Sequence, residues 1–460
     1  MRTLIVNGTV VNASGVERAD VLVDGERIAV VGVDVARERV DRTIDAVGKL
    51  VIPGAVDIHT HMELPVGDVV ASDTFETGTR AAAFGGTTTI VDFATQSMGR
   101  PLREGLEAWH AKADGHACID YGFHMAICDV TDATLAEMDK MVREGVTSFK
   151  LFTAYPGRMY SDDGEILRAM FQAADNGGLI LMHAENGIAI DVLAARYVRA
   201  GLTSPWYHGL SRPATLEAEA VNRVARMADV AGIPVYIVHL SSRDALEEVR
   251  RARERGTTVY AETCPQYLFL SDADLARPDG AAFVCAPPLR PRDHQAALWD
   301  GLISGELQLV STDHAPFDLH GPKTLGHDDF RLIPGGVPGV EERVDLIHDA
   351  GVVGGRISLQ RWVELISAAP ARLAGLEGRK GVLAPGADAD IVIYDPNRRH
   401  TLSASTHHMN VDYSCYEGRV VQGGADVVLS RGEVIVDHGQ WLGRAGHGRF
   451  LKRSTVATRP

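Results

Sequence analysis

Cysteines and long apolar runs are scarce in this sequence of 460 residues. Its five cysteines form no CxxC pair or dense framework, so we expect reduced thiols and a cytoplasmic location. The sequence shows no transmembrane span, and its opening, MRTLIVNGTVV, alternates like a strand and lacks the basic start and apolar core of a secretory signal. We therefore expect neither a membrane-embedded protein nor a secreted protein stabilised by disulfides.

Basic residues are also fewer than acidic residues. Lys and Arg number 46 against 61 Asp and Glu, which gives a formal net charge of -15. Because phosphate binding is driven by clustered Lys and Arg, this balance argues against nucleic acid or an anionic membrane as the main partner. It favours a small-molecule partner.

The composition is that of an ordinary globular protein, with 45% apolar and 23% charged residues. At this length, one large domain with a smaller companion accounts for the whole chain. Both ends consist of short strand-like segments separated by turn signals such as Asn-Gly and Asp-Gly. We predict a small β-sandwich domain from residues 1–52 and 376–444, a catalytic domain over 53–375 and a C-terminal tail over 445–460.

Between the two ends, apolar strand-like runs alternate with amphipathic stretches such as LAEMDKMVREG and DALEEVRRARERG. This alternation is typical of parallel α/β folds. Eight strand candidates favour a closed (β/α)₈ barrel, the TIM barrel, over a doubly wound sheet. The candidates are GAVDIHTH, TTTIVDF, YGFHMAI, TSFKLF, LILMHAE, VYIVHLSS, TVYAETCP and LQLVSTDHAP.

Ionisable residues lie in or at the ends of five of these strands, where the active sites of TIM barrels are found. Because strand side chains alternate with a period of two, His59 and His61 point the same way and can reach one cation. Histidine and aspartate are usual ligands of catalytic zinc, and this set has enough donors for more than one metal ion. The set is His59 and His61 on the first strand, Lys150 on the fourth, His183 on the fifth, His239 on the sixth and Asp313 on the eighth.

Lys150 does not fit a metal site as an ammonium. It would be repelled by the metal ions and would lose its solvation inside the barrel. Either Lys150 is an ordinary lysine paired with a carboxylate, or its charge is changed chemically.

The ordered series of motifs resembles the hydantoinase and dihydropyrimidinase family of binuclear metal-dependent amidohydrolases. The resemblance covers essentially the whole chain. It implies that the cyclic amide bond of hydantoins or dihydropyrimidines is hydrolysed to N-carbamoyl amino acids by a hydroxide that bridges two metal ions. The motifs are DIHTHMELP, ETGTRAAAFGGTTTIVDF, SFKLFTAY, HAENG, ETCPQYLFL, APPLRP, STDHAPF, IPGGVPGVEERV and GADADIVIYDP.

The resemblance also implies roles for single residues. Lys150 would be carboxylated by carbon dioxide and would bridge two divalent ions, for which zinc is favoured. Asp313 would carry the proton from the attacking water to the leaving nitrogen, and Tyr155 would bind the substrate and stabilise the oxyanion. One ion would be held by His59, His61, Lys150 and Asp313, and the other by Lys150, His183 and His239.

Two loop positions that hold the substrate through main-chain groups are commonly Ser and Asn in the family, and they are Ala286 and Gly335 here. These changes put the substrate preference in doubt. The loops that shape the pocket for the exocyclic substituent carry mostly apolar residues. These are Met62, Leu64, Val66, Phe152 and Met159. The resemblance further implies a homotetramer, with the tail at 445–460 reaching a subunit interface.

Three alternatives stay open. Allantoinases share the barrel and the metals; they generally lack the residue that matches Tyr155, although Ala286 leans towards them. Dihydroorotase-like chains usually carry an arginine two residues beyond the HxH pair, where this chain has Glu63. A non-catalytic scaffold of the same fold would have lost metal ligands, whereas every ligand position is filled here.

Overall fold

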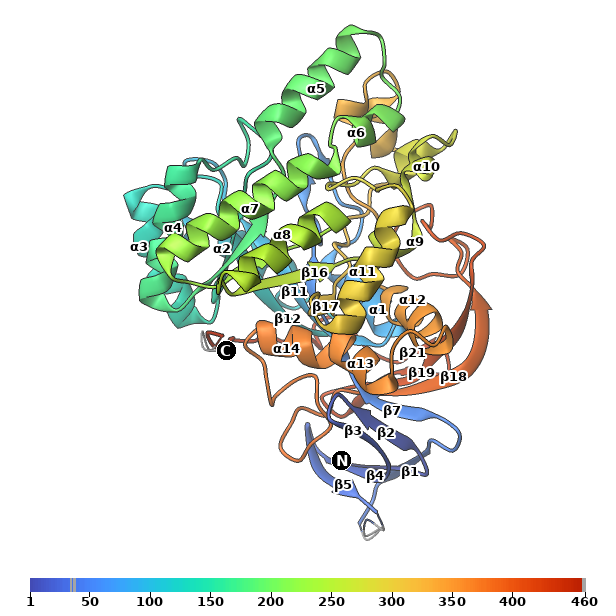
Figure 1. Cartoon of the computed structure of the whole chain (residues 1–460). Helices are drawn as coiled ribbons and strands as arrows, with labels where there is room; N and C mark the ends of the chain where they lie inside the picture. The colour runs from blue at the N-terminus through green and yellow to red at the C-terminus, as the bar shows by residue number, and fades with distance from the viewer. Residues whose placement is uncertain (34, 36–38, 457–460) are drawn as a thin grey trace.

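The computed structural model describes residues 1–33, 35 and 39–456. Helices surround a central barrel of strands, and a smaller region of β-sheet lies at one end of the molecule (Figure 1). Within these described ranges, no helix is both long and apolar enough to cross a membrane.

The barrel consists of eight parallel strands hydrogen-bonded in chain order. Main-chain bonds join its first strand to the end of its last, because the N–H of Asp313 donates to the carbonyl of His59 and the N–H of His61 donates to the carbonyl of His314, each over 2.9 Å. The predicted TIM barrel is thus confirmed. Its strands are β8 (Ala55–Thr60), β11 (Thr87–Thr95), β12 (Asp120–Ala126), β13 (Ser148–Phe152), β14 (Leu179–His183), β15 (Val235–Ile237), β16 (Val259–Thr263) and β17 (Leu309–Val310).

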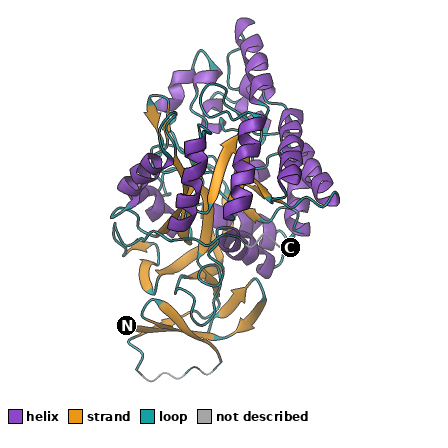
Figure 2. Ribbon diagram, turned by 90° about the vertical axis from the view of Figure 1, so that its left-hand side faces the viewer, coloured by secondary structure: helices purple, strands orange, loops and turns teal. Residues whose placement is uncertain are grey.

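The helices form a layer outside the barrel strands (Figure 2). The α-helices are α1 (Phe75–Phe84), α2 (Leu102–Ala113), α3 (Asp132–Glu144), α4 (Asp163–Asn176), α5 (Gly187–Arg199), α6 (Trp206–Leu210), α7 (Ala214–Ala231), α8 (Arg243–Glu254), α9 (Pro265–Phe269), α10 (Asp272–Leu275), α11 (Asp293–Ser304), α12 (Arg343–Ile347), α13 (Leu359–Val363) and α14 (Ala369–Leu373). Short 3₁₀ and π segments are η1 (Gly280–Phe283), η2 (Pro322–Gly326), η3 (Phe330–Leu332), η4 (His348–Val353) and η5 (Glu364–Ala368).

Local sequence signals set the ends of the helices. The hydroxyl of Thr131 accepts the N–H of Thr134 and so caps α3, which ends at Gly145 in the left-handed region at φ 92°. Ser242 caps α8 in the same way. Both helices expected from LAEMDKMVREG and DALEEVRRARERG are therefore present.

The two ends of the chain share a β-sheet region, as predicted. A seven-stranded sheet takes strands from both ends, and Ile391 of the C-terminal segment pairs with Pro53 of the N-terminal one. A second, four-stranded sheet uses N-terminal strands alone. The strands are β1 (Arg2–Val6), β2 (Thr9–Asn12), β3 (Gly15–Arg18), β4 (Asp20–Asp24), β5 (Arg27–Gly32), β6 (Arg42–Asp45), β7 (Leu50–Pro53), β18 (Ile391–Thr401), β19 (Val420–Ser430), β20 (Glu433–Asp437) and β21 (Gln440–Trp441), with a separate hairpin of β9 (Pro65–Val66) and β10 (Val69–Val70) after the first barrel strand.

The C-terminal tail lies against the barrel of its own chain. The N–H of Leu451 donates to the carbonyl of Tyr121 over 2.7 Å, and the N–H of Arg453 donates to that of Gly145. Leu451 is fully buried in the apolar cluster that contains Phe93 of the barrel interior. The tail thus packs at the N-terminal end of the barrel, opposite the predicted active site; residues 457–460 lie outside the described residues, and the placement of 445–460 at a subunit interface stays a prediction.

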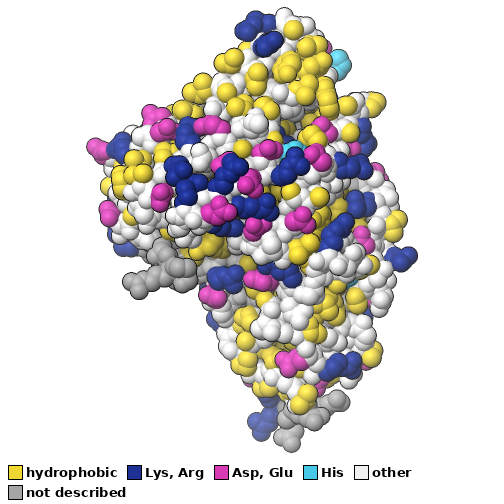
Figure 3. Space-filling view, in the orientation of Figure 1, with side chains coloured by type: hydrophobic (Ala, Val, Ile, Leu, Met, Phe, Trp, Pro, Cys, Tyr) yellow, Lys and Arg dark blue, Asp and Glu magenta, His cyan; other side chains and the backbone are white. Residues whose placement is uncertain are grey.

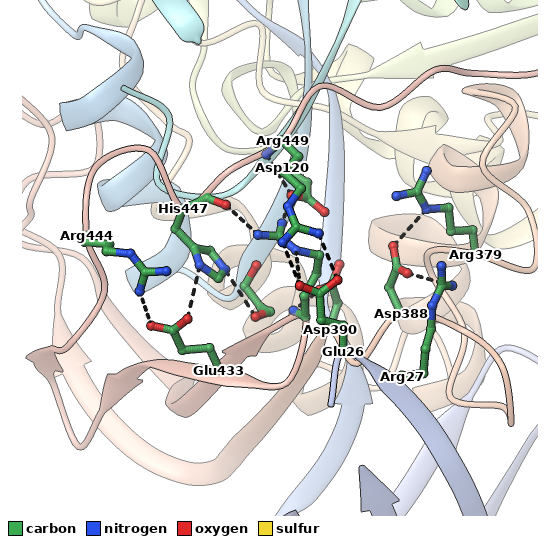
Figure 4. A network of polar contacts seen from close by, with 12 residues as sticks. Glu26, Arg27, Asp120, Arg379, Asp388, Asp390, Glu433, Arg444, His447 and Arg449 are labelled. Atoms are coloured by element: carbon green, nitrogen blue, oxygen red, sulfur yellow. Dashed lines mark hydrogen bonds and ion pairs between the residues drawn. The ribbon is translucent and has the colours of Figure 1, made fainter. Parts of the chain in front are cut away.

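A buried ionic network fastens the β-sheet region to the barrel (Figure 4). The ammonium of Lys380 lies 2.7 Å from a carboxylate oxygen of Asp120, 3.0 Å from one of Asp388 and 2.5 Å from one of Asp390. The guanidinium of Arg431 pairs with the other oxygen of Asp120. Because each charge has partners, the cost of burying these groups is offset by direct contacts.

Acidic and basic side chains are interspersed on the face of α7 and α8 that Figure 3 shows. Arg223 pairs there with Glu219, and Arg251 with Glu248. This face therefore lacks the continuous basic surface that nucleic acid would require.

Candidate active site

The structure brings all six of the predicted ligands together at the C-terminal end of the barrel. Nε2 of His59 and Nε2 of His61 lie 3.0 and 3.1 Å from the same oxygen of Asp313. Nζ of Lys150 lies 3.1 Å from Nε2 of His59. The ring of His239 is centred 5.3 Å from that of His59 and 4.5 Å from that of His183. Strands far apart in sequence thus contribute to one cluster.

The residues of this cluster fit a metal ion. One ligand atom from each of His59, His61 and Asp313 lies within 4.8 Å of the others. Both ring nitrogens of His239 and Nδ1 of His61 are buried without a hydrogen-bond partner among the described residues. Leaving buried donors or acceptors unpaired is costly, and a cation in the cluster would satisfy them.

Lys150 is buried, with its ammonium 4.1 Å from the centre of the Phe93 ring and 5.3 Å from that of Phe152. Burial lowers the pKa of Lys150 to about 8, although Asp313 and Glu262 act in the opposite direction. A larger fraction of this amine is therefore neutral at physiological pH than for an exposed lysine.

The protonation states of His61, His239 and Asp313 suit metal binding. At His59, burial and Lys150 lower the pKa, but Asp313 and Glu262 outweigh them and raise it. Burial lowers the pKa of His61 to about 4 and holds that of His239 well below its usual value, so both rings are neutral. Burial alone would raise the pKa of Asp313, but His59 and His61 hold it well below the usual range. Neutral imidazoles and an ionised carboxylate are the forms that bind cations.

Three site residues have a left-handed backbone that side-chain-bearing residues seldom adopt. The φ angles are 62° at Tyr155, 41° at His239 and 54° at Asp313. Such conformations cost free energy and persist where the surrounding structure enforces them, which is common at functional sites. Here they occur just after barrel strands, where they turn side chains into the barrel mouth.

Tyr155 is part-buried beside the cluster, with its ring 5.1 Å from that of His183. The guanidinium of Arg212 lies 5.8 Å from the Tyr155 ring. Burial raises the pKa of the Tyr155 hydroxyl, so the hydroxyl stays protonated and can donate a hydrogen bond.

Two carboxylates that form hydrogen bonds with the ligand histidines were not predicted from the sequence. Oε1 of Glu262, on β16, lies 2.5 Å from Nδ1 of His59. Oε2 of Glu185 lies 2.9 Å from Nε2 of His183 and 2.8 Å from the guanidinium of Arg212. Glu262 fixes the orientation of the His59 ring, and Glu185 fixes that of the His183 ring. Such hydrogen bonds also raise the basicity of a histidine that binds metal. The pattern that pointed to the ligands also marks these two residues, because Glu262 lies one residue before the end of the seventh strand and Glu185 follows His183 by two residues.

Ala286 and Gly335 lie on loops that touch one another. Ala286 is part-buried and Gly335 is exposed. The N–H of Gly336 donates to the carbonyl of Val284 over 3.0 Å. A side chain at Gly335 would meet no atom within 4 Å, whereas one at Gly336, at φ 147°, would collide with the carbonyl of Ala315. Only Gly336 therefore needs to be glycine on steric grounds.

The five residues predicted to form the substituent pocket lie in different surroundings. Met62 is fully buried in the core, beneath Gly78 of α1, so it is packed away from any opening. Leu64 and Val66 pack against the cluster of Ala71, Ala315 and Phe317. Phe152 lies beside His183, and Met159 is part-exposed. Of the five, Phe152 thus lies beside the ligand cluster, and Met62 is packed away from it.

Comparison with known proteins agrees with this geometry. The Amidohydrolase family model matches residues 50–421. The chain is 59% identical to a D-hydantoinase of Streptomyces coelicolor over 99% of its own length and 98% of that protein, and 45% identical to a D-hydantoinase of Geobacillus stearothermophilus over 99% and 97%. The crystal structure of a dihydropyrimidinase from Brevibacillus agri superposes with a TM-score of 0.98 at 45% identity, covering 100% of both chains. The chain belongs to the amidohydrolase family and, within it, to the hydantoinases and dihydropyrimidinases.

Proposed function

We propose that this enzyme hydrolyses the cyclic amide bond of hydantoins and dihydropyrimidines to give N-carbamoyl amino acids. The observation that carries the proposal is the convergence of His59, His61, His183, His239, Lys150 and Asp313 on one cluster, with Tyr155 beside it. Names of close relatives, D-hydantoinase and dihydropyrimidinase, agree with this substrate class.

Two divalent ions, preferably zinc, are proposed for the cluster. His59, His61, Lys150 and Asp313 would hold one, and Lys150, His183 and His239 the other. When bound, such ions supply Lewis acidity and lower the pKa of a coordinated water from about 15.7 towards about 7.

Lys150 is proposed to carry a carboxylate. Its neutral amine would attack carbon dioxide, a nitrogen–carbon bond would form, and one proton would leave the nitrogen. Support comes from burial, which lowers the pKa of this amine to about 8, and from its position 3.1 Å from His59. The product replaces a buried cation with an anion that can bind metal.

Asp313 is proposed to move the proton. Its carboxylate is ionised and lies next to the ring nitrogens of His59 and His61. It would accept the proton of the attacking water and return it to the ring nitrogen that leaves. Tyr155, whose hydroxyl stays protonated, would donate a hydrogen bond to the carbonyl oxygen as negative charge develops there.

Substrate contacts are proposed from the loops at Ala286 and Gly335, through main-chain groups. The apolar side chains of Leu64, Val66, Phe152 and Met159 would line the space for the exocyclic substituent, whereas Met62 would support this wall from the core. Because relatives are named D-hydantoinases, we propose a preference for the D enantiomer.

A homotetramer in the cytoplasm is proposed for the assembly. Ile188 and Val192 of α5 are 55% and 64% exposed. Figure 3 shows apolar side chains gathered at the top of the face that it draws, where Figure 1 places α5. Exposed apolar surface of this kind favours subunit contacts.

Comparative turnover of hydantoin, 5-phenylhydantoin, dihydrouracil, allantoin and dihydroorotate tests the function, with chiral analysis of the products. We expect turnover of the first three and the D product from 5-phenylhydantoin. Turnover of allantoin or dihydroorotate alone would contradict the proposal. Purified protein that binds no metal and turns over none of the five would indicate a non-catalytic scaffold.

A further inference from the structure

Lys323 is a buried lysine outside the metal cluster. It lies on η2 with 1% of its surface exposed. No carboxylate of the described residues forms an ion pair with it. A buried ammonium without a counter-charge is costly, and this cost lowers the pKa of Lys323 to about 8.

Two main-chain carbonyls accept the hydrogen bonds of this ammonium. Nζ of Lys323 donates to the carbonyl of Val284 over 3.1 Å and to that of Gly336 over 2.7 Å. The Val284 carbonyl also accepts the N–H of Gly336 over 3.0 Å. Lys323 therefore completes a bridge between two segments that are about fifty residues apart in sequence.

The two bridged segments are those proposed to hold the substrate. Val284 precedes Ala286 by two residues, and Gly336 directly follows Gly335. The second segment also lies along the end of the eighth strand, because the N–H of Ala315 donates to the carbonyl of Val337 over 3.1 Å. Ala315 is two residues from Asp313 in the chain. Main-chain hydrogen bonds and a short stretch of backbone therefore connect the Lys323 bridge to Asp313, the proposed proton carrier.

The geometry points to Lys323 as a positioning residue that sets the spacing of the Ala286 and Gly335 loops and thereby the affinity for the cyclic amide. The inference rests on the proposed function, since that function assigns the two loops to the substrate. Both hydrogen bonds of the Lys323 ammonium go to main-chain carbonyls, so its role is to position the loops. Its loss would leave the Gly336 carbonyl without its ammonium donor and would let the two loops separate, while the metal cluster stays as it is.

Steady-state kinetics of the Lys323→Met variant, measured on the full-length, metal-loaded enzyme, test the positioning role of Lys323. Methionine keeps an unbranched apolar chain but cannot donate. We expect KM for dihydrouracil to rise by about tenfold or more, with kcat and metal content close to wild type. Lys323→Arg, which keeps the charge and the donors, should have a KM nearer to wild type.

Arg453→Met is the matched control. Arg453 is also a buried cation, 4% exposed, and it donates to the carbonyls of Ala374 and Phe123 near the opposite end of the barrel. Its loss should lower stability without raising KM. An unchanged KM in Lys323→Met, or an equal rise in Arg453→Met, overturns the inference. If Lys323→Met does not fold, Lys323→Gln, which has a neutral and shorter side chain, takes its place with the same expectations.

Hydrogen exchange separates this inference from the proposed function. The non-proline amides of 284–289 and those of 335–337 should exchange faster in Lys323→Met than in Arg453→Met, and this readout needs no turnover. If both segments exchange faster in Lys323→Met but the wild-type enzyme turns over no cyclic amide, the proposed function is refuted and the structural role of Lys323 is retained. Unchanged exchange in an active enzyme would refute the bridge alone.

Discussion

Glu262 holds His59 through the ring nitrogen that faces away from the metal cluster. Its Oε1 lies 2.5 Å from Nδ1 of His59, while Nε2 of the same ring lies 3.0 Å from Asp313. The other oxygen of Glu262 accepts the hydroxyls of Tyr236 and Ser311. The carboxylate therefore keeps the proton of His59 on Nδ1 and leaves Nε2 free to bind a cation.

Glu262→Gln should weaken metal binding. The amide cannot fix the ring in the same way, and changes of such supporting carboxylates typically cost about 10- to 100-fold in metal affinity or activity. Metal content after dialysis against a weak chelator, together with kcat, measures the effect. Glu342→Gln, at a buried carboxylate remote from the cluster, is the control and should keep its metal. If Glu262→Gln keeps as much metal as Glu342→Gln, Glu262 does not support metal binding through His59.

Lys150→Ala should lose bound metal and nearly all activity, because the proposed bridging carboxylate is gone. The exposed Lys140→Ala on α3 should retain both. Metal analysis and native mass spectrometry, which detects the added mass of one carbon dioxide on the wild type, give the result. A fully metallated and active Lys150→Ala enzyme would exclude carboxylated Lys150 from the mechanism.

Asp313→Asn should fold and bind substrate but turn it over slowly. Loss of a positioned acid–base group typically lowers the rate by about 10²- to 10⁴-fold. Circular dichroism checks the fold and steady-state kinetics give kcat and KM. Should kcat remain at the wild-type value, another group must carry the proton.

Glu342 should make stability depend on pH. Burial raises the pKa of this carboxyl to about 8 from the usual 4.5, with Glu341 and Glu417 acting in the same direction. The folded state thus keeps a proton that the unfolded state loses, so stability falls as pH rises from about 4.5 to about 8. The free energy of unfolding from urea titrations at several pH values measures this.

Glu342→Gln resembles the protonated acid and can still accept the hydroxyl of Ser414. At pH values below the usual carboxyl range the variant should match the wild type, and above pH 8 it should be more stable by a few kcal/mol. Identical pH profiles for the two proteins would contradict the raised pKa.

Much of the fold follows from local patterns in the sequence. The eight strand candidates match β8 and β11 to β17 because buried parallel strands are short apolar runs, readable without tertiary information. The ligands were readable for the same reason: a charged or imidazole side chain at the end of an apolar strand has few structural explanations. Glu262 and Glu185 carried this signal too, but nothing in the sequence tells which histidine each supports.

The sequence by itself determined the barrel, the β-sheet region shared by the two chain ends, and the family to which the ligand set belongs. The tertiary structure alone decided which side chains meet: Met62 in the core, Leu451 beneath the barrel of its own chain, and Lys323 between the carbonyls of Val284 and Gly336. Periodicity encodes which face of an element is buried, whereas contacts between distant loops depend on how those elements pack together.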